Sequence, residues 1–493
     1  MIFSRLKSLS DEGEIIAGSK EEEKIKNKIR KILELVSDEI RVTPVRVLNW
    51  REKEIIVECE GNKIDAISFP YSLSTDTEGN VSDNFSECND KILKVNITSL
   101  FEVNKYYINA VKANCKAVIF SLDNENRRFV IKYGNMLDYG PCPPPPIPAI
   151  YVKSSDFNKI RGKCRIIIES EINPYATGYV IEGITNARNE NTVVHITSHH
   201  DHWLAGERDD LLAVSLLPEF RSNLYETHLI SYTAEESGSI YFSTFSWSYG
   251  SRTFLSNLGS EDLDNILINI NLDNISEYEI IIKTVPGLKD LFSGLYTTNI
   301  IDVPEIYTDS YSYIRNGIPS IDIGSKNNPH YHGEFDKIDP NDSKIIGNIN
   351  LIKNIISKII NNNIYYNFND MIEQVKNSML YAHPPLKTYL VNLIDRLRDK
   401  DIYVYRNLLK FYGGILDIEE NYANVKLFHK SYGIEEMIKR KSTICIENFQ
   451  CLEKPKESSS TYYRYFTYYL NELKEDVTNE YTDQLYLLLK KFL

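Results

Sequence analysis

Residues 193–202 read VVHITSHHDH, an apolar run of strand type that ends in a cluster of histidine and aspartate side chains. Four more apolar runs of strand type follow along the chain: HLISYTA (228–234), ILININ (266–271), EIYT (305–308) and PSIDIG (319–324). Stretches of helical pattern lie between and after them, for example SKIIGNINLIKNIISKII (343–360). Strands that alternate with helices predict an α/β fold, a mostly parallel, twisted sheet with helices on both faces.

Side chains that can bind metal or transfer protons come at the ends of these runs. They are imidazoles and carboxylates: His199, Asp209, Asp210, Glu235, Glu236, Asp273 and His332. The carboxyl ends of parallel strands share one edge of a sheet, so we expect these side chains to meet there. Several carboxylates brought together repel one another unless cations neutralise them. Two histidines and three carboxylates are zinc ligand types, enough for two ions if one carboxylate bridges.

The alternative reading of such acids is that they are solvated loop ends and helix caps. It carries little weight for the cluster as a whole, because four separate strands deliver its members to one edge. For Asp210, Asp336 and His202 the sequence leaves both interpretations open.

The flanking sequence suggests further parts of the chain. Residues 20–38 carry apolar side chains at helical spacing and predict an amphipathic helix within an N-terminal part, 1–44. Residues 45–172 consist of short β-type runs separated by turn residues and predict a β-rich insert. Its runs are RVLNW, EIIVECE, CKAVIFSL, RRFVIKY, AIYVK and RIIIES. The α/β domain then occupies 173–365, and a Tyr-rich, helical C-terminal region occupies 366–493.

Length, charge and cysteine usage set limits on function. The 493 residues correspond to about three domains of average size. The net charge of −13 argues against a nucleic-acid partner, and no apolar run reaches the ~18 residues of a membrane span. The first residues lack the apolar segment of a signal peptide. The seven cysteines are scattered without a CxxC pair, which argues against a thiolate zinc site and predicts a reducing, cytoplasmic location.

Five motifs resemble the co-catalytic zinc aminopeptidases of clan MH: TSHHDH, AGERDD, TAEESG, NINLD and PHYHGEFD. This family includes secreted bacterial aminopeptidases, glutamate carboxypeptidase II and the transferrin receptor ectodomain. The resemblance covers roughly residues 176–363 and the helix at 20–38. Within the insert, CKAVIF and IPAIYVKSSDF look like a protease-associated domain.

The resemblance implies a di-zinc peptidase and a role for each matching residue. The implied metal ligands are His199 and Asp273 on the first zinc, Glu236 and His332 on the second, and Asp209 as the bridging carboxylate. Glu235 matches the general base, Asp201 matches the acid that orients the His199 imidazole, and Tyr331 matches a tyrosine that steadies the tetrahedral intermediate. In the family the peptide bond after the bridging aspartate is cis.

The expected activity is hydrolysis of peptide bonds, most simply the release of N-terminal residues from a peptide substrate. A carboxypeptidase on the same scaffold is the first alternative, with Arg208, Arg252 and Arg315 as candidates for gripping a substrate carboxylate. A one-metal glutaminyl cyclase and a non-catalytic binding protein are further alternatives, and the intact ligand set counts against both. The chain departs from the family in LLAVS after Asp210 and in an insertion at 239–249, at the rim of the expected site.

The C-terminal region has no counterpart in the family. Its apolar side chains recur at helical spacing: Tyr463, Phe466, Tyr469, Leu470 and Leu473. Exposed apolar stripes of this size are uncommon in monomers, so we expect burial against the rest of the chain or against a second subunit in a homo-oligomer.

Overall fold

The computed structural model describes residues 1–98, 102–122, 125–131, 147–186, 192–239, 247–294, 299–302, 304–305, 307–377, 391–392, 394 and 402–420. The tail side chains expected to be buried lie outside these residues, as does most of the insertion at 239–249. Among the helices in the described ranges, none combines the length and the apolar character needed to cross a membrane.

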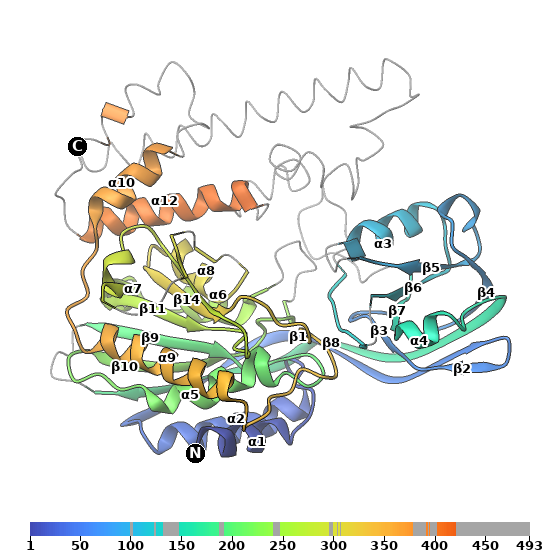
Figure 1. Cartoon of the computed structure of the whole chain (residues 1–493), viewed down its shortest axis with the longest axis horizontal. Helices are drawn as coiled ribbons and strands as arrows, with labels where there is room; N and C mark the ends of the chain where they lie inside the picture. Colours follow the sequence, from blue (N-terminus) through green and yellow to red (C-terminus); the bar gives the residue numbers. More distant parts are fainter. Residues whose placement is uncertain are drawn as a thin grey trace.

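The centre of the fold is a sheet whose middle strands run parallel (Figure 1). These strands are β9 (Val193–His199), β10 (Glu226–Tyr232), β11 (Ile266–Leu272) and β14 (Ser320–Ser325). They stand in the order β14-β11-β9-β10, with β12 (Ile280–Thr284) antiparallel to β14 and β8 (Lys163–Thr185) antiparallel to β10. A short strand, β13 (Ile300–Ile301), pairs with β12. The expectation of a mostly parallel sheet is confirmed.

The prediction of a strand at EIYT (305–308) is wrong. The described residues of EIYT form no strand, and β12 is built instead from the isoleucine run at 280–282. Ile280 and Ile282 are buried against β14, whereas Pro304, which precedes EIYT, has no N–H to give to a ladder.

Helices cover both faces of the central sheet (Figure 1). Val180 and Ile181 are neighbours in β8, so their side chains point to opposite faces of the sheet, and each is buried in a different core. Ile181 packs in a core with α1 (Ile2–Ser10), α2 (Lys20–Glu34), α5 (Leu212–Leu216) and α9 (Ser343–Ile360). Val180 packs in a second core with α6 (Tyr249–Ser256) and α8 (Ser310–Arg315), near α7 (Ser260–Asn265).

The predicted N-terminal helix is α2. The Ser19 hydroxyl accepts a hydrogen bond from the Glu22 amide at 3.0 Å and caps its first turn. Ile25, Ile29 and Leu33 recur at helical spacing and are buried against the sheet. The helix therefore docks on the central sheet, as the predicted topology requires.

Two long strands link this part of the chain to the insert. β1 (Glu39–Cys59) and β8 pair antiparallel along most of their length, and β1 turns back through β2 (Asn62–Ile64). The insert adds β4 (Thr75–Ser82), β5 (Ile92–Asn96), β6 (Ala117–Ser121), β7 (Ala149–Val152) and β3 (Ala66–Ser68), in that order after β8. It also contains η1 (Phe85–Glu87), α3 (Val103–Lys112) and α4 (Ser154–Phe157).

The run RRFVIKY was expected to be a strand of this insert, and for its described residues that is wrong. Residues 127–131 belong to no strand, and Arg127 forms an isolated bridge to Gly333 of the α/β part. The segment therefore contacts another part of the molecule, which a pattern of alternating residues cannot reveal.

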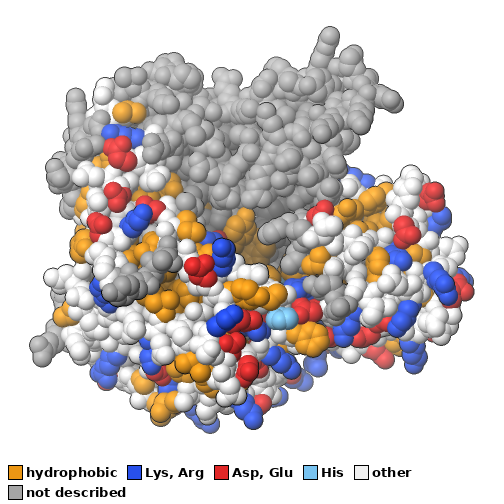
Figure 2. Space-filling view, viewed as in Figure 1, with side chains coloured by type: hydrophobic (Ala, Val, Ile, Leu, Met, Phe, Trp, Pro, Cys, Tyr) orange, Lys and Arg blue, Asp and Glu red, His pale blue; other side chains and the backbone are white. Residues whose placement is uncertain are grey.

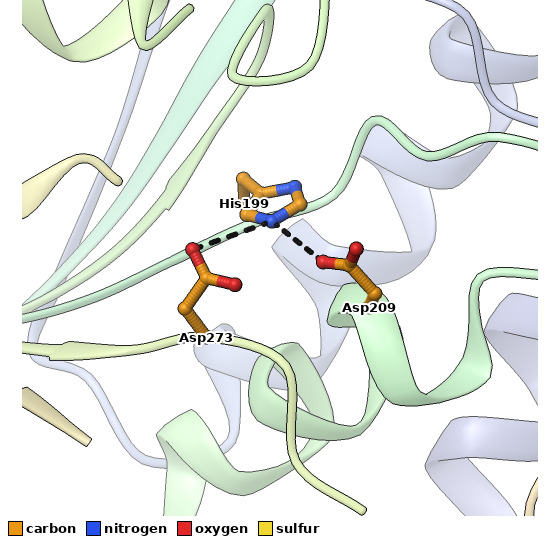
Figure 3. A group of neighbouring side chains, drawn as sticks. All are labelled: His199, Asp209 and Asp273. Atoms are coloured by element: carbon orange, nitrogen blue, oxygen red, sulfur yellow. Dashed lines mark ion pairs between the residues drawn. The ribbon is translucent and has the colours of Figure 1, made fainter. Parts of the chain in front are cut away.

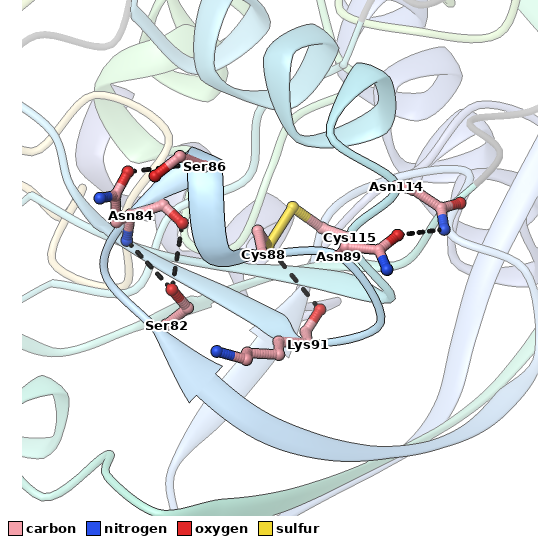
Figure 4. The surroundings of a disulfide bond; sticks show 8 residues. All are labelled: Ser82, Asn84, Ser86, Cys88, Asn89, Lys91, Asn114 and Cys115. Carbon is pink, nitrogen blue, oxygen red and sulfur yellow. Dashed lines mark hydrogen bonds between the residues drawn. A yellow bond between two sulfur atoms is a disulfide. The ribbon is translucent and has the colours of Figure 1, made fainter.

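Four cysteines form two disulfides within the insert. Cys59 and Cys164 join β1 to β8, with Cα atoms 4.1 Å apart. Cys88 and Cys115 join the end of η1 to the segment before β6 (Figure 4). The expectation of reduced cysteines is wrong for these four, because partners separated by 105 and 27 residues meet only once the strands pair. The location of the protein stays a prediction.

The described part of the C-terminal region is helical, as expected. It contains α12 (Ile402–Glu420), which lies beside α8, and α10 (Phe368–Asn377), which lies beside α12 (Figure 1). Tyr405 and Leu408 of α12 are buried in the main core, and Tyr405 donates a hydrogen bond to the Pro286 carbonyl. Figure 2 shows acidic and basic side chains interspersed over the described surface of this view.

Candidate metal centre

The strand ends bring six acidic and imidazole side chains to one edge of the sheet. β9 ends at His199, the segment after β10 carries Glu235 and Glu236, and Asp273 follows β11. Asp209 lies in the turn η3 (Glu207–Leu211), and His332 lies in the loop after β14. The described residues form three groups of possible ligands. Two of them share one carboxylate: His199, Asp209 and Asp273, and then Asp209, Glu236 and His332; the third is His199, Glu235 and Glu236. Within each group the ligand atoms lie within 4.8 Å of one another.

The first group is drawn in Figure 3. His199 Nε2 lies 3.3 Å from Asp209 Oδ1 and 3.8 Å from Asp273 Oδ2, so both carboxylates face the same ring nitrogen. Ligands ~2.0–2.2 Å from a tetrahedral zinc are separated by ~3.3–3.6 Å. The observed separations are close to this range, and the three atoms can face one ion.

The second group uses the other oxygen of the shared carboxylate. His332 Nε2 lies 2.7 Å from Glu236 Oε1 and 3.6 Å from Asp209 Oδ2. The opposite ring nitrogen of His332, Nδ1, lies 3.0 Å from the Arg128 carbonyl oxygen. The two oxygens of Asp209 are thus turned to different groups, which is the arrangement of a bridging ligand.

Burial makes this cluster electrostatically costly without a cation. It raises the pKa of Glu235 and of Glu236 well above the usual value. Burial alone would lower the pKa of His199, but hydrogen bonds to Asp209 and Asp273 outweigh it and hold that pKa well above 6.5. Asp209 Oδ2 is buried and has no hydrogen-bond partner among the described residues. A buried carboxylate oxygen without a hydrogen-bond partner, surrounded by imidazole nitrogens and other carboxylate oxygens, fits a site for divalent metal ions.

Asp201 holds the segment that carries both glutamates. Its Oδ1 accepts from the Glu235 amide at 3.0 Å, and its Oδ2 accepts from the Glu236 amide at 3.1 Å. His199 Nδ1 lies 2.9 Å from the Asp201 backbone carbonyl oxygen and 4.0 Å from the Asp201 carboxylate. The Asp201 main chain therefore orients the His199 imidazole, and its side chain fixes the turn at 235–236.

Sequence reasoning missed Ser248. Its hydroxyl donates to Glu235 Oε1 at 3.1 Å, and its amide donates to the Glu235 carbonyl at 2.8 Å. Two residues on, a Cβ at Gly250 would lie 1.8 Å from the Thr233 carbonyl oxygen, so only glycine fits there. The GSRTF motif that starts at Gly250 was the available signal, since it marks a close backbone approach.

Asp210 and Asp336 are buried, so neither is a solvated loop end. Asp210 Oδ2 accepts from the His199 amide at 3.3 Å, and Asp336 Oδ2 accepts from the Asp209 amide at 3.2 Å. The Asp209–Asp210 peptide bond is cis, as the resemblance implied. His202 is also buried, beside Gly206, and lies outside all three groups of possible ligands.

A cavity opens beside the cluster. Tyr331, Trp247 and Tyr307 line it together with Glu235 and the carboxylates of the metal groups. The Tyr331 ring stacks on the His332 ring with centroids 3.7 Å apart. Burial and the neighbouring carboxylates raise the pKa of Tyr331 well above 10, so its hydroxyl keeps its proton and can donate.

The arginines considered for a substrate carboxylate are bound within the protein. Arg208 Nε pairs with Glu277 Oε2 at 3.0 Å, and Arg252 Nη2 donates to the Trp247 carbonyl at 2.9 Å. Arg315 also has interactions within the protein, in the last turn of α8. None of the three is among the described residues that line the cavity.

The chain is similar to known proteins in sequence and in fold. Residues 180–355 match the model of peptidase family M28. The solved structures that resemble the chain include three at 16–18% identity. They are an aminopeptidase from Aneurinibacillus sp. strain AM-1 (18% identity, TM-score 0.53), a zinc aminopeptidase from Bacillus subtilis (16%, 0.56) and a peptidase M28 precursor from Shewanella amazonensis SB2B (16%, 0.61).

The alignments cover 74%, 75% and 74% of this chain and 95%, 96% and 94% of the respective relatives. No curated protein sequence matches the chain. The structural likeness at this identity establishes the fold, and the family match falls on the segment that carries the metal-ligand motifs. This chain therefore carries a domain of peptidase family M28 over residues 180–355.

Proposed function

We propose that this chain is a zinc-dependent aminopeptidase that binds two zinc ions and releases N-terminal residues from peptides. The observation that carries the proposal is the pair of ligand groups that share Asp209. His199 and Asp273 would complete the first zinc site, and Glu236 and His332 would complete the second. The family M28 match and the zinc aminopeptidase with the same fold support the choice of metal and reaction.

When bound, the two zinc ions supply Lewis acidity, which activates a water molecule and polarises the scissile carbonyl. Glu235 is the general base: it takes the proton of the attacking water and delivers it to the leaving amine. Burial raises its pKa, which brings this carboxylate toward the range in which a proton shuttle works at neutral pH. The Ser248 hydroxyl holds Glu235 Oε1 in place.

Tyr331 is the donor proposed for the developing oxyanion. It lines the cavity beside Glu235, and its raised pKa keeps the phenol protonated. The carboxypeptidase alternative gains no support from Arg208 and Arg252, because their guanidinium groups already bind Glu277 and a backbone carbonyl.

A substrate panel tests the proposal. Purified protein should cleave amino-acid p-nitroanilides, should lose this activity in a chelator and should regain it with zinc. N-acetylated amino-acid p-nitroanilides should resist cleavage, because an aminopeptidase requires the free amine. Cleavage of N-blocked dipeptides, or activity that survives complete removal of metal, would contradict the proposal.

A further inference from the structure

The loop that carries His332 is held by the insert. Residues 125–129 lie along residues 329–334, although about 200 positions separate the two segments in the sequence. Arg128 and His332 exchange two hydrogen bonds: the Arg128 amide donates to the His332 carbonyl at 3.1 Å, and His332 Nδ1 lies 3.0 Å from the Arg128 carbonyl. Phe129 packs on the His332 ring with centroids 5.3 Å apart.

The contact at Nδ1 decides which nitrogen of His332 can bind a metal. A carbonyl oxygen only accepts, so Nδ1 must carry the proton in this hydrogen bond. In the neutral imidazole the lone pair is then on Nε2, the atom that faces Glu236 and Asp209. The Arg128 carbonyl thus selects the metal-binding tautomer and the ring orientation.

The Arg127 side chain fixes the same loop. Its guanidinium donates to the Tyr331 carbonyl and, at 2.5 Å, to the Pro329 carbonyl, and it pairs with Glu125 at 2.7 Å. The Arg127 side chain is 4% exposed, so water screens these contacts little. His332 has a φ of 56°, a left-handed conformation that a non-glycine residue holds only when its surroundings impose it.

The first metal group has no such link. Asp201 orients His199, and Asp336 binds the Asp209 amide. Within the part of the chain that the structure describes, His199, Asp209 and Asp273 make no hydrogen bond to residues 125–131. Asp209 belongs to both groups, and Glu236 also lies with His199 and Glu235 in a third group, but His332 belongs to the second group alone. The two halves of the centre therefore depend on different parts of the chain.

We propose that Arg127 and the Arg128 carbonyl are positioning groups, through which the insert sets the affinity of the second metal position and leaves the first position largely unaffected. This inference rests on the proposed di-zinc function. It gives the insert a role in assembling the centre: the α/β part supplies all the ligands, and the insert keeps one of them in its binding state.

The test compares Arg127→Met with Arg406→Met. Arg406 is a matched control, because it is also largely buried and donates to backbone carbonyls, those of Leu263 and Ile266, in a part of the molecule away from the cluster. Both variants should lose stability, which thermal unfolding measures. Zinc affinity of the metal-free proteins is then measured by competition with a chromophoric chelator.

Arg127→Met frees the loop that presents His332 to the Arg128 carbonyl. We expect it to weaken the second zinc by up to about 10–100-fold, the range for loss of an outer partner of a metal ligand, with the first zinc unchanged. Arg406→Met should keep both affinities. Arg127→Lys retains the charge but places its N–H donors on a single nitrogen, so it should give an intermediate affinity, and it serves as the test if the methionine variant does not fold.

The outcomes separate this inference from the proposed function. If the wild type binds fewer than two zinc ions, the di-zinc proposal fails. If the wild type binds two and the Arg127 variants keep both affinities, or lose both equally, only the positioning role fails. A kcat that returns to the wild-type value in excess zinc, with KM unchanged, would further support it.

Discussion

Glu235 and Glu236 are neighbours in sequence to which the proposed mechanism gives different tasks. Their amides are held by the two oxygens of Asp201, so the backbone of both is fixed independently of their side chains. Glu236 Oε1 faces His332 in the second metal group, whereas Glu235 Oε1 accepts from Ser248. Substitution of each by glutamine preserves size and shape and should fail in its own way.

The expected size of the effect follows from these contacts. Glu235→Gln keeps an oxygen that can accept from Ser248 and removes only the basic group. General acid–base catalysis contributes about 10²–10⁴-fold, or ~2.7–5.5 kcal/mol of activation free energy, so kcat should fall by that factor. Glu236→Gln replaces a charged ligand by a neutral one, and the zinc content should fall from two toward one per chain.

Metal analysis and steady-state kinetics on the same preparations give the answer. Glu235→Gln should retain two zinc ions with low kcat that added zinc does not restore. Glu236→Gln should recover part of its activity in excess zinc. The reasoning is refuted if both variants lose zinc equally, or if Glu235→Gln turns over near the wild-type rate.

Three further predictions concern the rest of the molecule. Burial alone would lower the pKa of His228, but its hydrogen bonds to two glutamates raise it above 6.5. The stability that protonated His228 adds is complete below about pH 6.5 and is lost as the pH rises through the raised pKa. The melting temperature of the wild type should therefore exceed that of His228→Gln most at acid pH. A difference in melting temperature that stays constant to pH 9 would contradict this prediction. Arg406→Met should lower the free energy of unfolding by about 2–4 kcal/mol, since it leaves several backbone carbonyls without a charged donor. An unchanged denaturation midpoint would show that these hydrogen bonds do not stabilise the fold. Of the seven cysteines, the Cys59–Cys164 and Cys88–Cys115 disulfides leave at most three free thiols. If thiol titration of the denatured, non-reduced protein finds more than three, at least one disulfide is absent, and seven free thiols would favour the cytoplasmic prediction.

The parts predicted correctly from sequence are those in which local pattern and chemistry coincide. β9, β10, β11 and β14 are buried apolar runs that can form only interior strands, and each ends at or near a metal-binding or proton-transferring side chain. Parallel strands present their carboxyl ends at one edge, so order along the chain was enough to bring His199 and Asp273 together.

The failures occur where an element is defined by a distant partner. The sequence of residues 127–131 predicts a strand, but these residues bind the loop at 329–334 and not a neighbouring strand. EIYT reads as a strand as well, although the isoleucine run at 280–282 takes that place in the sheet. The cysteine pairs and the support from Ser248 likewise depend on contacts across the folded chain.

The orientation of the ligands also could not be derived from residue identity. Asp201 was expected to orient His199 through its carboxylate, but the nearer contact is its backbone carbonyl, and the carboxylate binds two amides. The Arg128 carbonyl does the same for His332. Backbone groups are present at every position, so no sequence motif distinguishes the few that act in this way.

The most direct test of the account is the position of bound zinc in a crystal grown with the metal. Anomalous difference density at the zinc edge should show two peaks, each within about 2.0–2.2 Å of one Asp209 oxygen. One peak should also contact His199 and Asp273, and the other should contact Glu236 and His332. A single peak in the fully loaded crystal, or two peaks that do not share Asp209, would contradict the proposed centre.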